Sequence, residues 1–151
     1  MSGSAGGAWP AGSRGSHCHS HLVDPRPLPS ARHSRNTPFL SPAERDACLQ
    51  ALPLWSLGED GKSIERRFTA KNFLAAMDWF NRVAVLAEAE THHPDLHLTS
   101  YRDVCVVLST HAVGGLTQPD AIMAAKLDGL PVDYSPKWLA QHPEAEHTAL
   151  K

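Results

Sequence analysis

Long apolar runs, paired cysteines and a large excess of charge are all missing from this 151-residue sequence. No apolar stretch approaches the roughly 20 residues that a membrane-spanning helix needs. The three cysteines, Cys18, Cys48 and Cys105, share no short spacing, so neither a disulfide framework nor a zinc knuckle is indicated and a reducing compartment is the default. The net charge of −2 and the pI of about 6.5 favour neither nucleic acid nor a membrane as a partner.

The first 40 residues have the composition of a disordered extension. Five of the ten glycines fall in residues 1–15, and five prolines lie between Pro10 and Pro38. Such a segment buries too little apolar surface to offset the entropy of ordering. Its charged residues are four arginines and one aspartate, a balance typical of organelle transit peptides, although a low-complexity extension is the alternative. We therefore expect the protein in the cytoplasm, or in a chloroplast or mitochondrion.

Histidine is unusually abundant, with ten copies. The tract His-Cys-His-Ser-His at residues 17–21 contains metal-ligand residue types, but no matching ligands follow at structural-zinc spacing, so we expect no metal site there. The stronger candidates lie in the centre of the chain. His92 and His93 are adjacent, Glu88 precedes them by one helical turn, and His111 follows further on.

Residues 41–130 carry the signals of one folded domain. Ser41 as N-cap, with proline and glutamate after it, predicts a helix over residues 42–52. Strands are predicted at 54–57 and 63–68, joined by an Asp-Gly turn, and the second strand sets Ile64 among charged residues. The side chains of the helix that we expect to face inward are Ala47, Cys48 and Ala51.

A long helix is predicted over residues 70–90, with Thr69 as its N-cap. Its apolar residues recur at spacings of three and four, which indicates one continuous stripe. The predicted stripe is Phe73, Met77, Phe80, Ala84 and Ala87, widened by Leu74, Val83 and Leu86, and the predicted solvent side carries Asp78, Arg82 and Glu90. Taken alone, Glu88 is explained as well by an ordinary surface acid as by a partner of the histidines.

A second hairpin follows the histidine pair. Strands are predicted at 96–101 and 104–110 with a turn at residues 102–103, and His111 stands at the end of the second strand. Both faces of that strand are apolar toward its middle, which indicates a central position in the sheet or an outer face that meets another subunit.

The last predicted helix begins at Thr117, with Asp120 as its capping-box partner, and ends at Gly129. Residues 131–151 show little periodicity and predict a loose tail. The expected fold is therefore α+β in the order α-β-β-α-β-β-α, a four-stranded antiparallel sheet with three helices packed on one face. A domain of this size buries little surface, so we expect a homo-oligomer.

A longer pattern surrounds the histidines. It comprises Glu88, His92, His93, Pro94, Tyr101, Ser109, Thr110, His111, Gly115, Leu116, Thr117 and Asp120, with Trp55 upstream. This pattern resembles that of the pterin-4a-carbinolamine dehydratase family over residues 41–130.

The resemblance implies an α+β fold, assembly into dimers or dimers of dimers, and no metal or organic cofactor. It also implies dehydration of 4a-hydroxytetrahydrobiopterin to quinonoid dihydropterin, which recycles the cofactor of the aromatic amino acid hydroxylases. Some members bind transcription factors as dimerisation cofactors, and relatives in photosynthetic organisms are tied to Rubisco assembly. The alternative function is thus a non-catalytic binding role on the same fold.

The resemblance also implies residue roles. His92 and His111 are the expected acid and base, since imidazoles exchange protons near neutral pH. His93 is expected to bind the pterin and assist, and Glu88 to orient an imidazole. The residues expected to bind substrate or to shape the pocket are Pro94, Trp55, Asp120, Ser109 and Thr110.

Overall fold

The computed structural model describes residues 27–32 and 35–150. The histidine tract at residues 17–21, where we expect no metal site, and most of the N-terminal extension lie outside these residues. Across the described part of the chain, no helix is both long enough and apolar enough to cross a membrane.

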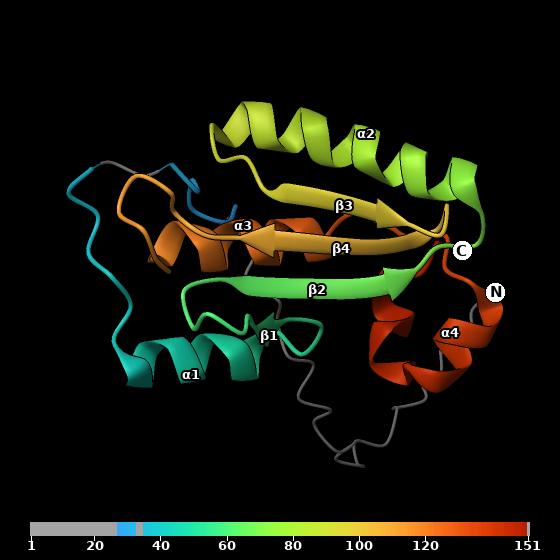
Figure 1. Ribbon diagram of the computed structural model, residues 1–151, viewed down its shortest axis with the longest axis horizontal. Helices are drawn as coiled ribbons and strands as arrows, with labels where there is room; N and C mark the ends of the chain where they lie inside the picture. Colours follow the sequence, from blue (N-terminus) through green and yellow to red (C-terminus); the bar gives the residue numbers. More distant parts are fainter. Residues whose placement is uncertain (1–26, 33–34, 151) are drawn as a thin grey trace, which may run out of the picture.

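Four antiparallel strands form the sheet, in the spatial order β1-β2-β4-β3 (Figure 1). Their bounds are β1 (Ser56–Leu57), β2 (Ile64–Thr69), β3 (Asp95–Thr99) and β4 (Asp103–Leu108). The ladder between β2 and β4 runs from the pair Ile64 and Leu108 to the pair Thr69 and Asp103. The predicted antiparallel sheet and the central place of β4 are confirmed, although β1 is shorter than expected.

The turn between β3 and β4 is centred on residues 100–101, whereas the sequence predicted it at residues 102–103. The Arg102 amide donates to the Thr99 carbonyl at 3.2 Å, so Ser100 and Tyr101 occupy the two central positions, with φ of 47° and 59°. Two consecutive positive φ angles define a type I′ turn, which normally uses asparagine and glycine. Neither residue is present here, which explains why the sequence did not reveal the turn.

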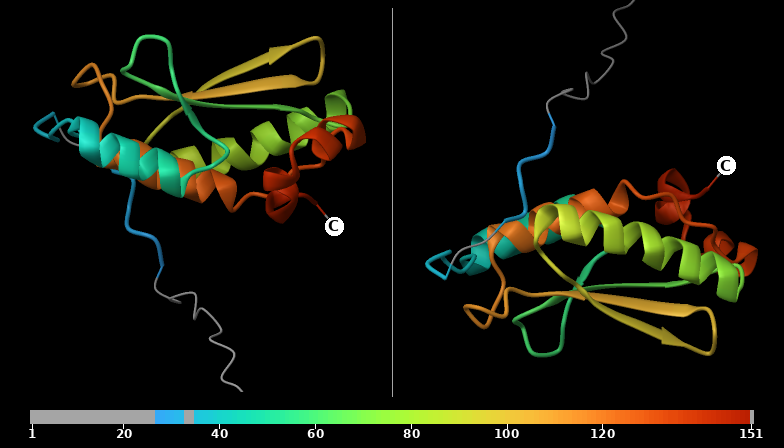
Figure 2. Two further views of the ribbon diagram at one scale, coloured as in Figure 1. Left: turned by 90° about the horizontal axis from the view of Figure 1, so that it is seen from below. Right: turned by 90° about the horizontal axis from the view of Figure 1, so that it is seen from above.

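The helices all lie on one face of the sheet (Figure 2). They are α1 (Pro42–Ala51), α2 (Phe73–Glu90), α3 (Gln118–Asp128) and α4 (Pro136–Gln141), followed by the 3-10 helix η1 (Pro143–Thr148). The inward face of the sheet comes from alternate residues of its central strands, and α2 and α3 cover it. The predicted element order and the single helical layer are confirmed, with α4 and η1 added to them.

The face that helix α2 turns to the core overlaps the predicted stripe only in part: Val83 and Ala87 are buried as predicted. Its buried residues are Ala76, Trp79, Val83 and Ala87. Phe73 and Leu74 are exposed instead, and Ala84 is exposed as well. The helix is apolar on nearly all sides, so periodicity alone does not select the buried face. Trp79 decides it, because its ring packs edge-on against Phe68 of β2 at 5.1 Å between centroids.

The N-terminal ends of two helices test the capping predictions. Ser41 caps α1, and the Ser41 amide donates to Glu44 Oε2 at 2.8 Å as predicted. Thr69 does not cap α2, because it stays in the β2–β4 ladder. The cap is Asn72, whose Oδ1 accepts from the Ala75 amide at 2.8 Å.

The inward face predicted for α1 is also wrong. Ala47 and Ala51 are exposed and Cys48 is only half-buried. None of the helix's own residues is fully buried, since α1 lies at the margin of the helical layer. Leu52, directly after it, enters the core instead.

The C-terminal segment is packed, so the loose tail predicted for residues 131–151 is wrong over the described residues. Arg66 is buried on the inward face of β2, which the sequence did not suggest. Its guanidinium donates to Asp128 Oδ1 at 2.9 Å and to the Tyr134 hydroxyl at 2.6 Å. Tyr134 and Thr148 are joined through their hydroxyls at 2.6 Å. These polar contacts, together with the buried side chains of Val132 and Ala145, hold the segment.

Residues 29–32 and 35–40, which we call the strap, cross the helical layer before α1. Glu90, predicted to face solvent, anchors one end: its Oε2 accepts from the Ala31 amide at 2.7 Å and its Oε1 accepts from Lys126 Nζ. The Lys126 ammonium and the Ala31 amide hold the pKa of Glu90 below its usual value. At the other end, the Leu40 amide donates to the Leu116 carbonyl at 3.0 Å.

We predict that Arg66→Met lowers the free energy of unfolding by about 3 kcal/mol at pH 7, because Asp128 then keeps a buried charge without its partner. Burial raises the pKa of Asp128, and Arg66 opposes this shift. When folding raises the pKa of a carboxyl, the free energy of unfolding of the protein falls as the pH rises through that pKa. Removing Arg66 makes this fall larger. The deficit of the variant should therefore shrink when urea unfolding is repeated near pH 4.

Arg67→Met is the matched control, since Arg67 is the next residue of β2 and its side chain is exposed. We expect its stability to stay within about 0.5 kcal/mol of the wild type. Equal deficits for the two variants, or a deficit at position 66 that does not respond to pH, would contradict the prediction.

Candidate active site

The end of α2 directs the two adjacent histidines to opposite sides. Thr91 follows the helix in the left-handed conformation, with φ of 53°, and the chain then enters β3. The His92 amide donates back to the Ala87 carbonyl at 3.2 Å. As a result, the His92 side chain is only 2% exposed, whereas that of His93 is 61% exposed.

His92 belongs to a buried polar network around Asp120. His92 Nε2 donates to Asp120 Oδ1 at 2.7 Å. The other oxygen, Oδ2, accepts from the Thr117 amide at 2.8 Å and from the Thr110 hydroxyl at 2.9 Å. Asp120 is fully buried, so the carboxylate depends on these donors in place of water. The network joins the segment just after β4, the start of α3 and the segment just after α2.

Two further histidines stand on the surface, each beside its own carboxylate. His93 Nε2 donates to Glu88 Oε1 at 2.7 Å, so Glu88 does contact a histidine, as the functional interpretation expected. His111 Nε2 lies 3.8 Å from Asp95 Oδ2, and the His111 side chain is 71% exposed. The hydrogen bond to Glu88 fixes the orientation of the His93 ring. The Asp95 carboxylate lies near His111 without a hydrogen bond to it.

A short closed loop carries His111. The Thr110 amide donates to the Gly115 carbonyl at 2.9 Å, and the Gly114 amide donates back to the Thr110 carbonyl at 2.9 Å. Gly114 has φ of 74°, a conformation that side-chain-bearing residues rarely adopt. The loop therefore places His111 just beyond β4, while Thr110 beside it points inward to Asp120.

Some predicted site residues join this arrangement and others do not. Thr110 and Asp120 belong to the network around His92, and Pro94 follows His93 directly. Ser109 is the first residue after β4 and is half-buried. Trp55 is elsewhere, because its Nε1 donates to Asp128 Oδ1 at 2.9 Å. Asp128 lies eight residues beyond Asp120 in sequence, which is about 12 Å along a helix.

Nothing in the sequence assigned a role to Asp95, although it lies in the stretch from Glu88 to Asp95 that holds the histidine pair, and the contacts of Thr117 were not predicted. Asp95 carries no motif signal of its own, although its place right after the His-His-Pro run was available as a hint. Thr117 was expected only as a helix cap. Its hydroxyl also lies 2.6 Å from the Thr110 hydroxyl, a contact that depends on how β4 and α3 meet.

The arrangement suits proton transfer more than metal chemistry. Within residues 27–32 and 35–150, no group of three or more histidine, cysteine, aspartate or glutamate side chains is arranged to hold a metal ion. Two exposed imidazoles with carboxylate partners, and a third imidazole held inside, form a set of groups able to give and take protons.

Comparison with protein families gives one match that covers most of the folded chain. Residues 38–130 match the model of the family described as pterin 4 alpha carbinolamine dehydratase. The matched region contains α1 to α3 and every histidine of the site. It stops at the end of α3, before the C-terminal segment that Arg66 holds.

Individual relatives show the same similarity. The chain is 44% identical over 87 residues to pterin-4-alpha-carbinolamine dehydratase 2, mitochondrial, of Arabidopsis thaliana, covering 56% of this chain but only 46% of that protein. It is 44% identical over 94 residues to a putative pterin-4-alpha-carbinolamine dehydratase of Halorhodospira halophila, covering 60% of this chain and 85% of that protein.

A solved structure is also similar. The transcriptional coactivator/pterin dehydratase from Brucella melitensis is 33% identical, with a TM-score of 0.57, and the match covers 61% of this chain and 97% of that one.

We predict that Asp120→Asn lowers the free energy of unfolding by about 2 kcal/mol, because a carboxamide replaces one accepting oxygen with an NH₂ group and leaves a buried donor unpaired. Asp95→Asn serves as the control at an exposed carboxylate and should change stability by less than about 0.5 kcal/mol. Guanidinium unfolding measures both. Similar values for the two variants would refute a structural role for the buried network.

Proposed function

The chain belongs to the pterin 4 alpha carbinolamine dehydratase family, and on that premise we propose that it dehydrates 4a-hydroxytetrahydrobiopterin to quinonoid dihydropterin and water. The observation that carries the proposal is the set of three histidines, each beside a carboxylate, where α2, β3 and β4 meet. A protein that only binds a partner has no physical need for three such pairs.

The proposed reaction is a balanced elimination. The bond between C4a and the hydroxyl oxygen breaks, the hydroxyl leaves as water after taking up one proton, and N5 gives up its proton as the C4a–N5 double bond forms. One group must therefore donate a proton and another must accept one, and no redox partner is needed. Paired imidazoles perform both steps well near neutral pH.

The resemblance assigns the acid and base roles to His92 and His111, and pterin binding to His93. The geometry supports a more specific division of work. His111 and His93 reach solvent, where a substrate arrives, while Asp120 holds His92 from within. The resemblance implies that Glu88 orients an imidazole without saying which one. Its hydrogen bond to His93 supports His93 as that imidazole.

A second candidate function is a binding role on the same fold. The similar structure from Brucella melitensis is named transcriptional coactivator/pterin dehydratase, and this name favours the second candidate. An assembly-factor or coactivator role for this chain predicts intact binding of a partner in variants that lack the histidines, and it needs no turnover of a pterin.

The cellular compartment stays a prediction, either cytoplasmic or an organelle. The Arabidopsis thaliana relative is named as mitochondrial, and the arginine-rich, acid-poor composition of residues 1–40 supports targeting. A fluorescent reporter fused to residues 1–40 distinguishes the two compartments.

We predict that His92→Ala and His111→Ala each reduce kcat/KM for the carbinolamine by about 10²–10⁴-fold, the usual contribution of a positioned acid or base. His93→Ala should raise KM more than it lowers kcat, as expected for a binding role. Stopped-flow absorbance measures dehydration by the full chain.

His97→Ala is the control in these measurements, because His97 is exposed on β3 and belongs to none of the histidine–carboxylate pairs. Its kinetics should match the wild type. Wild-type turnover no faster than that of the His92→Ala/His111→Ala double variant would sink the enzyme proposal and favour the binding role.

We also predict a homodimer or a dimer of dimers. Among the described residues, strand β3 pairs on one side alone, and α2 exposes Phe73, Leu74 and Val85. Both features are typical of surfaces that another copy covers. Light scattering on the eluting protein should give a multiple of the chain mass of 16.4 kDa. A mass equal to one chain at micromolar concentration would contradict this assembly.

A further inference from the structure

We propose that Phe39 is a positioning residue for the histidine site: its ring packs on Gly115 and thereby holds the loop that carries His111. Phe39 belongs to the strap, outside the histidine motif. The expected effect on the reaction rate rests on the proposed dehydratase function. The effect on the placement of His111 and His92 does not.

The first observation is how closely Phe39 approaches the loop. A Cβ atom at Gly115 would lie 2.6 Å from Phe39 Cε1 and 2.8 Å from Phe39 Cδ1, well inside van der Waals contact. The ring therefore rests directly on the backbone of Gly115, and only glycine permits this approach. Gly115 closes the loop through its carbonyl, which accepts from the Thr110 amide.

The second observation is that the backbone of the strap pairs with the residues after the loop. Phe39 forms an isolated antiparallel bridge with Thr117, and the Leu40 amide donates to the Leu116 carbonyl at 3.0 Å. Thr117 in turn donates to Asp120, which accepts from His92. One short segment thus touches both ends of the site, the loop of His111 and the network of His92.

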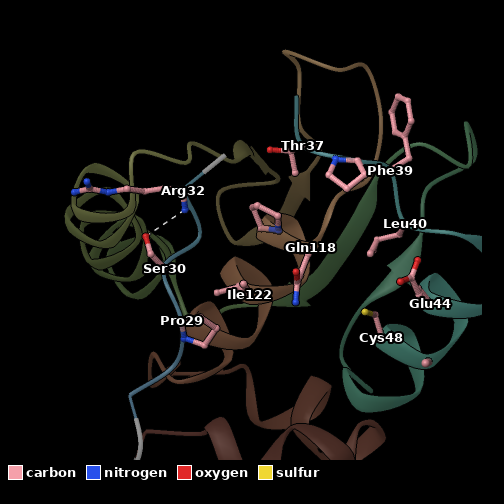
Figure 3. A pocket seen from close by; sticks show the side chains of 13 residues that line it. Pro29, Ser30, Arg32, Thr37, Phe39, Leu40, Glu44, Cys48, Gln118 and Ile122 are labelled. Atoms are coloured by element: carbon pink, nitrogen blue, oxygen red, sulfur yellow. Dashed lines mark hydrogen bonds between the residues drawn. The ribbon is translucent and has the colours of Figure 1, made fainter. Parts of the chain in front are cut away.

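A second set of contacts holds the other end of the strap, far from Phe39. There the Ala31 amide and the Ser30 hydroxyl donate to Glu90 at the end of α2. Figure 3 shows Pro29, Ser30 and Arg32 on one side of a cavity of about 650 Å³, and Leu40, Glu44 and Cys48 on the other. The strap therefore spans from the helix that precedes the histidine pair to the loop that follows the third histidine.

The third observation is that Phe39 does little for the core. It is 59% exposed and does not belong to the hydrophobic core or to the residues packed against it. Loss of such a ring costs little transfer free energy, since most of its surface already meets water. The contact with Gly115 is consequently the main structural effect of the side chain, and that effect is local to the loop.

Phe39→Ala should lower kcat for dehydration by about tenfold while KM changes less than about twofold, because a misplaced acid or base slows the reaction more than it weakens binding. Phe39→Leu, which keeps an apolar side chain over Gly115, should restore most of the lost rate. Leu150→Ala is the matched control, since Leu150 is 49% exposed and lies beyond the histidine site and beyond the residues that match the family. Equal kcat values for Phe39→Ala and Leu150→Ala would overturn the proposal.

A double-mutant cycle tests whether the contact itself matters. Gly115→Ala should displace the ring and lower kcat about as much as Phe39→Ala does. In the Phe39→Ala background the added methyl meets no ring, so the double variant should be no slower than either single variant. Additive losses, about a hundredfold together, would show that the two residues act separately and would overturn the proposal.

A measurement without substrate separates this inference from the proposed function. Long-range ¹H–¹⁵N spectra record the ring nitrogens of each histidine. Phe39→Ala and Gly115→Ala should shift the signals of His111 and leave those of His97 unchanged. Unmoved His111 signals would overturn the inference, whatever the activity. If the two variants shift the His111 signals but the wild-type protein does not dehydrate the carbinolamine, the proposed function is refuted and the positioning role stands.

Discussion

The fully buried carboxylate of Asp120 is the constraint on which the site depends. Burying an ionised group without hydrogen-bond donors costs several kcal/mol, so both oxygens of this carboxylate require donors. They come from Thr110 after β4, from Thr117 at the start of α3 and from His92 after α2. Satisfying one charge therefore brings three chain segments together. The positions of His93 and of the His111 loop follow from that meeting point, since each is the neighbour of a residue in the network.

A second buried charge performs the same task for the C-terminal segment. Arg66 reaches from β2 to Asp128 at the end of α3 and to Tyr134 beyond it. Asp120 and Asp128 thus mark the two ends of α3, one holding the site and the other holding a segment outside the family match. Helix α3 is fixed at both ends by hydrogen bonds to the carboxylates of Asp120 and Asp128, while Met123 and Leu127 pack into the core between them. This explains how the sheet, the helices and the tail form one unit.

The histidines differ in their surroundings more than their sequence pattern suggests. Adjacent in sequence, His92 and His93 separate into a buried and an exposed side chain because Thr91 reverses the chain in the left-handed region. His93 and His111 meet solvent with the carboxylates of Glu88 and Asp95 beside them. The site thus combines one buried imidazole, that of His92, which Asp120 holds in place, with two imidazoles, those of His93 and His111, that solvent reaches.

Local chemistry in the sequence determined the caps at Ser41 and Thr117 and the two hairpins, because these depend on neighbours within a few residues. The sequence also carries the family pattern around Glu88, His92, His93 and His111. Only the tertiary structure decided which face of α2 is buried, since that helix is apolar almost all round and Trp79 chooses its side. It also decided that Arg66 is an interior residue, that Trp55 binds Asp128, and that Asp95 and Phe39 stand beside the site. Each of these contacts joins residues distant in sequence, and no local preference encodes such a meeting.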